Sequence, residues 1–250
     1  MSGHSKWHNI RLRKGKVDAQ RGALFTKLSK EIILAAKSGS PDPEANYRLK
    51  MAIEKARENN MPLDNIKRAI ARATGAEGGK DIEEVRYEGY GPHGVAVIVD
   101  VATDNRNRTA SEMRFLFSRS GGNLGETGGV AWQFEPRGVV EVETAGRGEE
   151  QLVEMALIDG VEDVRYDTER SEIVTDVTAL QAVREALSAA GLKVTDARLS
   201  MEPKQTVALA GDEARAVLRF LDALEEHEDV QTVYSNVDLS GADLEALARA

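Results

Sequence analysis

The residues of this chain that could do chemistry gather at its start, where cationic side chains surround one tryptophan. Each Lys or Arg that neutralises a phosphate releases condensed counterions, so a cationic segment is typical of contact with a polyphosphate. Trp7 lies inside the run, and a ring among cations is suited to stacking on an unpaired base. The sequence therefore predicts a nucleic-acid contact. The residues selected on this basis are Lys6, Trp7, Arg11, Arg13, Lys14, Lys16, Arg21 and Lys27.

Charge is divided unevenly along the 250 residues. Residues 1–79 hold 16 Lys and Arg against 8 Asp and Glu, whereas residues 80–250 hold 17 against 34. An acidic body repels nucleic acid at long range, so we expect any binding surface to be local and mainly N-terminal. The alternative is a basic tail that only contacts solvent, with Trp7 packed in a neighbouring groove.

A second cationic group lies from Asp104 to Arg108, just before a predicted helix. Backbone N–H groups and the helix dipole favour anions at such a position, where Arg106 and Arg108 could add bidentate phosphate contacts. The other interpretation is structural. In that case Asp104 and Asn107 satisfy the turn, and the arginines pair with nearby acids. The sequence leaves both interpretations open.

Patterns for catalysis or metal binding are missing from the sequence. It has no cysteine, its four histidines lack metal-ligand spacing, and neither HExxH nor Gly-x-Ser-x-Gly occurs. The Gly-rich loop from Gly121 to Gly129 lacks the Lys-Ser/Thr ending of a phosphate-binding loop. We therefore predict that the protein is not an enzyme and uses no metal, no cofactor and no small-molecule substrate.

Membrane and export signals are also missing from the sequence. The longest apolar runs, at 32–36 and 95–99, are far shorter than the roughly 20 residues of a membrane span. No apolar segment follows the charged N-terminus, as it does in a secretory signal. We expect a cytoplasmic protein without a membrane partner, and we expect a monomer.

The first 79 residues are predicted to form a basic arm and a domain of three helices. Helical spacing of apolar residues begins at Asp18, and Gly39 supplies a stop. Asp42, followed by proline, is predicted to start the second helix, and Pro62 the third. We expect these three helices to form a small bundle. Together with the strands predicted below, they indicate an α+β protein.

The apolar period then changes to two. Strands are predicted at 85–90, 95–101 and 130–134, and a capping box at Thr109 is predicted to open a helix. The first two strands are joined by Gly91-Pro92-His93-Gly94, which is a hairpin signal. These elements lack closure by themselves. We therefore predict a discontinuous α/β domain formed by residues 80–137 and 204–240.

Residues 138–203 have the order strand, helix, strand, strand, helix, strand, with a cap predicted at Thr178 for the second helix. This βαββαβ order predicts an inserted ferredoxin-like domain. A terminal helix is predicted at 241–250.

Three blocks of the sequence closely resemble the YebC/PmpR family. They are GHSKWHNIRLRKGKVDAQRGALFTKLSKEI at 3–32, YEGYGPHGVAVIVDVATDNRNRT at 87–109 and SGGNLGETGGVAWQF at 120–134. The family's organellar relatives include the mitochondrial translational activator of a cytochrome oxidase subunit. The resemblance implies a helical N-terminal domain, a discontinuous α/β domain and an inserted α/β domain. His8 and His93 stand where the family is expected to have Ala and Gly.

The same resemblance implies control of gene expression. Bacterial members are described as DNA-binding transcriptional regulators, and others as ribosome-associated translation factors that assist proline-rich stretches. We predict a nucleic-acid-binding regulator whose partner is duplex DNA or, alternatively, rRNA or tRNA on the ribosome. The arm with its tryptophan favours RNA, since no helix stands out with Arg, Asn or Gln grouped for base edges.

Overall fold

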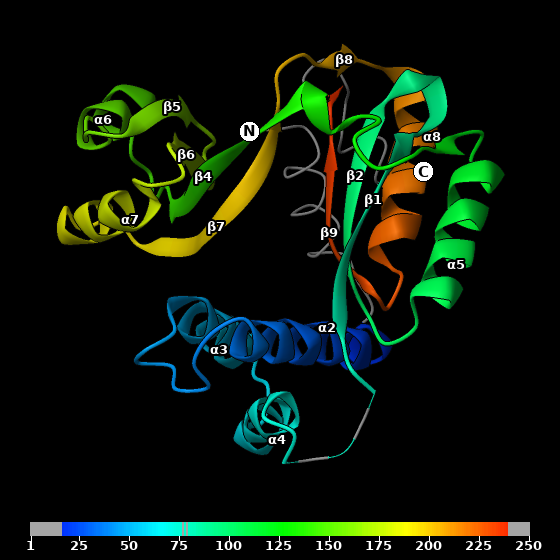
Figure 1. Ribbon diagram of the computed structural model, residues 1–250. Coiled ribbons are helices and arrows are strands. Elements are labelled where there is room, and N and C mark those ends of the chain that lie inside the picture. Colours follow the sequence, from blue (N-terminus) through cyan, green and yellow to red (C-terminus); the bar gives the residue numbers. More distant parts are fainter. Residues whose placement is uncertain (1–16, 77, 79, 240–250) are drawn as a thin grey trace.

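The structure is a computed structural model that describes residues 17–76, 78 and 80–239, with side chains from residue 22 onward. Figure 1 shows the N-terminal helices at the bottom, one sheet with two helices at the right and a second sheet with two helices at the left. This arrangement confirms the predicted α+β class, in which an N-terminal helical domain is followed by α/β domains. The helix predicted at 241–250 lies outside the described residues.

The helical domain contains α2 (Val17–Lys37), α3 (Tyr47–Glu58) and α4 (Leu63–Ala73). Its apolar residues recur every three or four positions and face one another, because that spacing places them on one side of each helix. The resulting core includes Leu28 and Ile32 of α2, Leu49 and Ile53 of α3, and Ile66 of α4.

The predicted start of α3 at Asp42 is wrong, because α3 begins at Tyr47. Asn46 is the N-cap, and its side-chain oxygen accepts a hydrogen bond from the Leu49 N–H at 3.1 Å. Its amide nitrogen donates to two carbonyls at the end of α2 and in the following turn, at 2.8 and 2.7 Å. These bonds make the buried Asn46 the better cap, while Asp42 closes a local turn by accepting from the N–H two residues ahead.

The central sheet is antiparallel, and two helices cover one of its faces. Its strands, in order across the sheet, are β3 (Asn123–Leu124), β1 (Glu83–Tyr90), β2 (Ala96–Thr103) and β9 (Val230–Ser235). The helices are α5 (Arg106–Arg119) and α8 (Gly211–Glu225). Alternate valines of β2 point at these helices, and Phe117 of α5 meets Phe220 of α8 edge to face, with ring centres 4.9 Å apart. The sheet thus combines strands from before and after residues 138–203.

The hairpin between β1 and β2 contains a short 3-10 turn, η1 (Pro92–Gly94). His93 has a φ of 58°, in the left-handed region that favours glycine. The family resemblance leads one to expect glycine at this position, and glycine would suit this φ better than the histidine that the sequence has.

The strand predicted at 130–134 is wrong. Residues Ala131–Gln133 form a 3-10 turn, η2, and Phe134 begins the next strand. The reason is the buried carboxylate of Glu88, which accepts the N–H groups of Gly128, Val130 and Ala131 at 2.9, 3.0 and 2.8 Å. Backbone donors that bind this carboxylate do not join a strand ladder.

The carboxylate of Glu88 is expected to determine how stable this loop is. Burial alone would raise the pKa of Glu88, but the three backbone hydrogen bonds lower it below its ordinary value. Glu88→Gln replaces one acceptor oxygen with a donor, which leaves backbone N–H groups unsatisfied. We expect a loss of about 2 kcal/mol in the free energy of unfolding. Thermal unfolding followed by circular dichroism measures it, with the exposed Glu126→Gln in the same loop as the matched control. Equal melting temperatures for both variants would contradict this account.

The inserted unit is a second antiparallel sheet with two helices. Its elements are β4 (Phe134–Glu143), α6 (Glu149–Met155), β5 (Val161–Arg165), β6 (Arg170–Thr175), α7 (Leu180–Ala189) and β7 (Val194–Pro203). The strand order β5-β6-β4-β7 together with the βαββαβ sequence confirms the ferredoxin-like unit. The boundary predicted between residues 137 and 138 falls within β4. After this unit, β8 (Val207–Ala208) pairs in parallel with β10 (Val237–Asp238).

The caps predicted at Thr178 and Thr109 are both wrong. The N–H and hydroxyl of Thr178 bind the carboxylate of Asp176 at 2.8 and 2.6 Å, and α7 begins two residues later. Thr109 lies inside α5, whose N-cap is Asn105; the Asn105 side chain accepts the Arg108 N–H at 3.2 Å. Arg106 and Arg108 therefore belong to the first turn of a helix.

Candidate nucleic-acid interface

Most residues of the predicted arm precede the described part of the chain. Lys6, Trp7, Arg11, Arg13, Lys14 and Lys16 lie outside the described residues, and Arg21 lies in the part of α2 whose side chains are not described. The arm enters the described structure at Val17, the first residue of α2. The position of α2 therefore decides where the arm joins the molecule.

Two lysines of α2 attach this helix to the end of α8. The ammonium of Lys27 donates a hydrogen bond to the backbone carbonyl of Glu225, in the last turn of α8. The ammonium of Lys30, one turn further along α2, donates to the carbonyl of Glu228 at 3.1 Å. Cations are stabilised by the free carbonyls at a helix C-terminus. Lys27 thus contributes to the junction between the helical domain and the central sheet.

The junction is centred on Asp229, whose side chain is fully buried between α2 and α5. One carboxylate oxygen accepts from Lys30 Nζ at 2.5 Å. The other accepts from Arg108 Nη2 at 2.6 Å and from the Thr109 hydroxyl at 2.7 Å. A single carboxylate therefore joins α2, the first turn of α5 and the loop before β9.

The ionisation of Asp229 follows from these contacts. Burial alone would raise the pKa of the carboxyl group, but hydrogen bonds from Lys30, Thr109 and Arg108 outweigh it and lower the pKa to about 2. The group is consequently a carboxylate at neutral pH. Arg108 is held in its charged form in turn, since the hydrogen bond to Asp229 raises the pKa of its guanidinium.

The two arginines of the first turn of α5 have different surroundings. Arg108 lies among carboxylates: besides Asp229, those of Asp104, Glu112 and Glu228 are 3.6 to 3.9 Å away. The structural interpretation of the sequence thus applies to Arg108. Arg106 is exposed, and its side chain pairs with none of the carboxylates in the described residues. The sequence could not reveal the main partner of Arg108, because Asp229 is 121 positions away.

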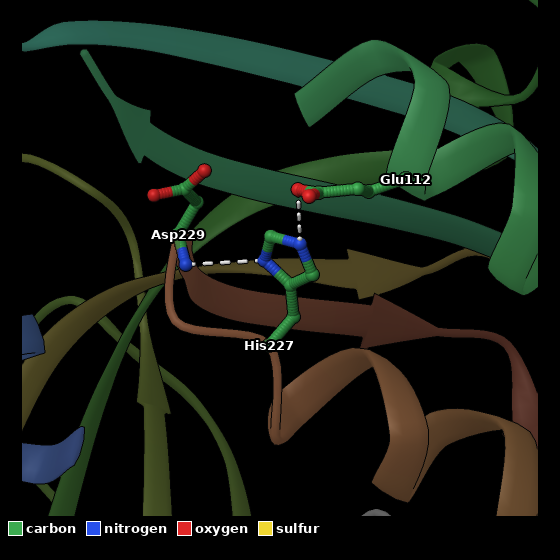
Figure 2. Close-up of side chains that lie close together, drawn as sticks. All are labelled: Glu112, His227 and Asp229. Carbon is green, nitrogen blue, oxygen red and sulfur yellow. Dashed lines mark hydrogen bonds and ion pairs between the residues drawn. The ribbon is translucent and has the colours of Figure 1, made fainter. Parts of the chain in front are cut away.

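A histidine lies beside this cluster, as Figure 2 shows. The Nδ1 of His227 accepts the Asp229 N–H at 3.1 Å, so its Nε2 carries the proton that reaches Glu112 at 2.9 Å. Glu112, His227 and Asp229 could each offer a metal-ligand atom within 4.8 Å of the others. However, the Asp229 carboxylate already binds two cationic groups, which would repel a metal ion. The geometry favours an ion-pair cluster over a metal centre.

No helix in the described ranges is both long enough and apolar enough to cross a bilayer.

Comparison with known proteins gives two family models that match consecutive parts of the chain. The model for the TACO1/YebC protein N-terminal domain matches residues 5–76, and the model for the TACO1/YebC second and third domain matches residues 82–237. Both models together span the arm, the helical domain and the two sheets.

Curated relatives match over nearly the whole chain. A probable transcriptional regulatory protein of Moorella thermoacetica is 54% identical over 250 residues, which covers 99% of both chains. A protein of the same description from Pelotomaculum thermopropionicum is 52% identical and covers 96% of this chain and 99% of its own. The crystal structure of a conserved hypothetical protein, Aq1575 from Aquifex aeolicus, is similar with a TM-score of 0.83 at 47% identity, covering 89% of this chain and 92% of that one.

Proposed function

The chain belongs to the TACO1/YebC family, and from this premise we propose that it is a nucleic-acid-binding regulator of gene expression. Its relatives carry the description of probable transcriptional regulatory proteins. The observation on which the proposal mainly rests is the Asp229 junction. Through Lys30 and Arg108, this junction holds the helix that follows the basic arm next to the first turn of α5. The helix that follows the arm and the start of α5, which are distant in sequence, thereby meet at one place.

In this proposal the cationic residues have two kinds of role. Those of the arm neutralise phosphates, Trp7 stacks on an unpaired base, and Arg106 adds a phosphate contact from the start of α5. Lys27 and Arg108 are positioning residues, because their side chains hold α2 and α5 in place. The arm residues proposed to contact phosphate are Lys6, Arg11, Arg13, Lys14, Lys16 and Arg21.

We propose further that the protein regulates by binding alone, as a cytoplasmic monomer that needs no cofactor. Duplex DNA is the partner suggested by the description of the relatives. Trp7 favours the second candidate, a translation factor that binds rRNA or tRNA on the ribosome, because an indole ring can stack only on bases that are not already stacked in a duplex.

A competition experiment tests the choice between these partners. The full chain is offered ribosomes and an excess of genomic duplex DNA at physiological salt, and the bound fractions are separated by sedimentation. Movement with ribosomes supports the translation factor, whereas enrichment of particular DNA sites supports the transcriptional regulator. A chain that remains in the supernatant with neither partner would contradict both forms of the proposal.

The stacking role of Trp7 gives a separate prediction. Trp7→Ala should weaken binding to single-stranded or structured RNA by about 1–3 kcal/mol, because one base loses its aromatic partner. Binding to duplex DNA should change little. Fluorescence anisotropy with labelled oligonucleotides measures both affinities. The matched control is Trp132→Ala, which removes the chain's other tryptophan, a residue that is 67% exposed. An equal loss on duplex DNA would indicate that Trp7 only supports the fold.

A further inference from the structure

Helix α5 lies at the edge of the molecule and turns one face to solvent (Figure 1). Its inner face carries Thr109, Met113 and Phe117, which are buried against the central sheet and α8. The outer face has no other element of the described chain over it in this view. Within the described ranges, the residues on that face are exposed.

The exposed residues of α5 are all cationic, polar without charge, or aromatic. They are Arg106, Asn107, Ser111, Arg114, Phe115, Ser118 and Arg119. The whole helix has four arginines and one glutamate, although residues 80–250 have twice as many acidic as basic residues. That one glutamate, Glu112, is turned toward His227 at the side of the helix. The outer face is thus a cationic strip on an acidic body.

Phe115 stands in the middle of this strip and is 60% exposed. The guanidinium carbon of Arg119 lies 5.9 Å from the centre of its ring, within the range of a cation–π contact. A ring that presents its surface to solvent among arginines has the composition of a stacking site for a base, whereas phosphate contact alone would not require the ring.

We propose that the outer face of α5 is a second nucleic-acid contact surface, which binds a single-stranded segment. Arg106, Arg114 and Arg119 contact its phosphates, and an unpaired base stacks on Phe115. This inference rests on the proposed function and gives that function a particular surface. The ligand is recognised by its phosphodiester backbone and an unpaired base, which RNA and single-stranded DNA share.

Besides the exposed ring of Phe115, two features of the molecule support a nucleic-acid strand as the occupant. Charge complementarity is local, since the cations of the strip contrast with the acidic body around it. The 14 residues of α5 extend about 20 Å, the length of about six stacked nucleotides.

The strip also begins beside the Asp229 junction. Arg106 occupies the same first turn of α5 as Arg108, which shares Asp229 with Lys30 of α2.

The test compares two triple variants of the full chain. Arg114→Ala, Phe115→Ala and Arg119→Ala together remove the strip. The control set, Arg170→Ala, Lys193→Ala and Leu157→Ala, removes two exposed cations and an exposed apolar side chain from the inserted unit. Anisotropy is measured with 20-nucleotide single-stranded RNA, single-stranded DNA and duplex DNA at 0.15 M salt. Melting temperatures establish that each variant folds.

We expect the α5 triple variant to bind at least one single-stranded probe at least tenfold more weakly, while the control set changes affinity less than twofold. Phe115→Ala alone should reduce single-stranded binding at least fivefold and duplex binding less than twofold. Arg114→Lys with Arg119→Lys should keep most of the affinity, because the charges remain. Loss on RNA alone identifies RNA as the source, and equal loss on both single strands identifies recognition of the shared chemistry.

The affinity of a variant that lacks residues 1–16 is measured for the same three probes. If the deletion weakens binding and the α5 triple variant does not, the inference about α5 is wrong and the proposed function stands. If the intact chain binds none of the three probes, the proposed function itself fails. Equal loss of duplex and single-stranded binding in Phe115→Ala would overturn the base contact.

Discussion

Deletion of residues 1–16 is expected to weaken binding to nucleic acid at least tenfold at moderate salt and to leave the melting temperature nearly unchanged. The deleted segment contains five Lys and Arg and no Asp or Glu. Each contact with a phosphate contributes through counterion release, so their joint loss is large. Stability should be retained, since the first buried side chain in the described part of α2 is that of Leu28. Anisotropy measures the affinity, and circular dichroism the melting temperature.

A variant of full length separates charge from chain length. In this variant, the five Lys and Arg of residues 1–16 are replaced by glutamine, and the segment keeps its full length. This variant should lose as much affinity as the deletion, apart from the part due to Trp7. An affinity equal to that of the intact chain, for either variant, would contradict the role proposed for the arm.

Asp229→Asn is expected to cause the largest loss of stability among single substitutions at the junction. The amide cannot balance Lys30, whose side chain is 13% exposed, and it removes the shortest ion pair of Arg108, so the buried site loses the negative charge that both cations share. Breaking a buried ion pair from one side costs about 3–5 kcal/mol. Chemical unfolding measures the difference. The control is Asp159→Asn at an exposed turn position, for which we expect less than about 0.5 kcal/mol.

The pH dependence of stability should follow the same carboxylate. The pKa of Asp229 is about 2 in the folded chain, below the ordinary value of 3.8. As the pH falls, the Asp229 carboxyl group is therefore protonated in the unfolded chain before it is protonated in the folded chain. The contribution is complete above about pH 4 and is lost between that pH and about 2. Asp229→Asn should accordingly flatten the decline of stability in this range, and an unchanged decline would show that other groups control it.

The fold could be predicted from the sequence where apolar spacing is regular. Apolar residues that recur with a period of 3.6 predicted the helices, and those that recur with a period of two predicted the strands. The strands predicted between residues 80 and 137 are too few to form a complete sheet, which predicted that further strands come from the segment after residue 203. The predictions were wrong where a single side chain forms hydrogen bonds with several backbone groups. Because the Asn46 side chain caps α3, this helix starts later than predicted. Because the Glu88 carboxylate binds backbone N–H groups, residues 131–133 form a turn although the apolar side chains around them alternate as in a strand. Such contacts depend on the folded arrangement and leave no local pattern.

The candidate interface could be predicted only in part. Composition alone identified the arm, because its charge contrasts with the rest of the chain. The junction at Asp229 could not be predicted, since it joins three segments that are far apart in sequence. The strip on α5 did leave a signal. Met113 and Phe117 are four positions apart and face inward, so the helical period places Phe115 on the outer side. The wrongly placed helix start at Thr109 hid the fact that Arg106 belongs to this helix.

The salt dependence of affinity is the most direct test of the arm as a phosphate-binding segment. The affinity of the full chain for a single-stranded RNA and for a duplex DNA is measured between 50 and 300 mM salt, beside the variant without residues 1–16. Five phosphate contacts from residues 1–16 predict that the slope of log K against log salt becomes shallower by about 3 to 5 when these residues are removed. Equal slopes for the two proteins, or an affinity of the full chain that does not vary with salt, would contradict the account.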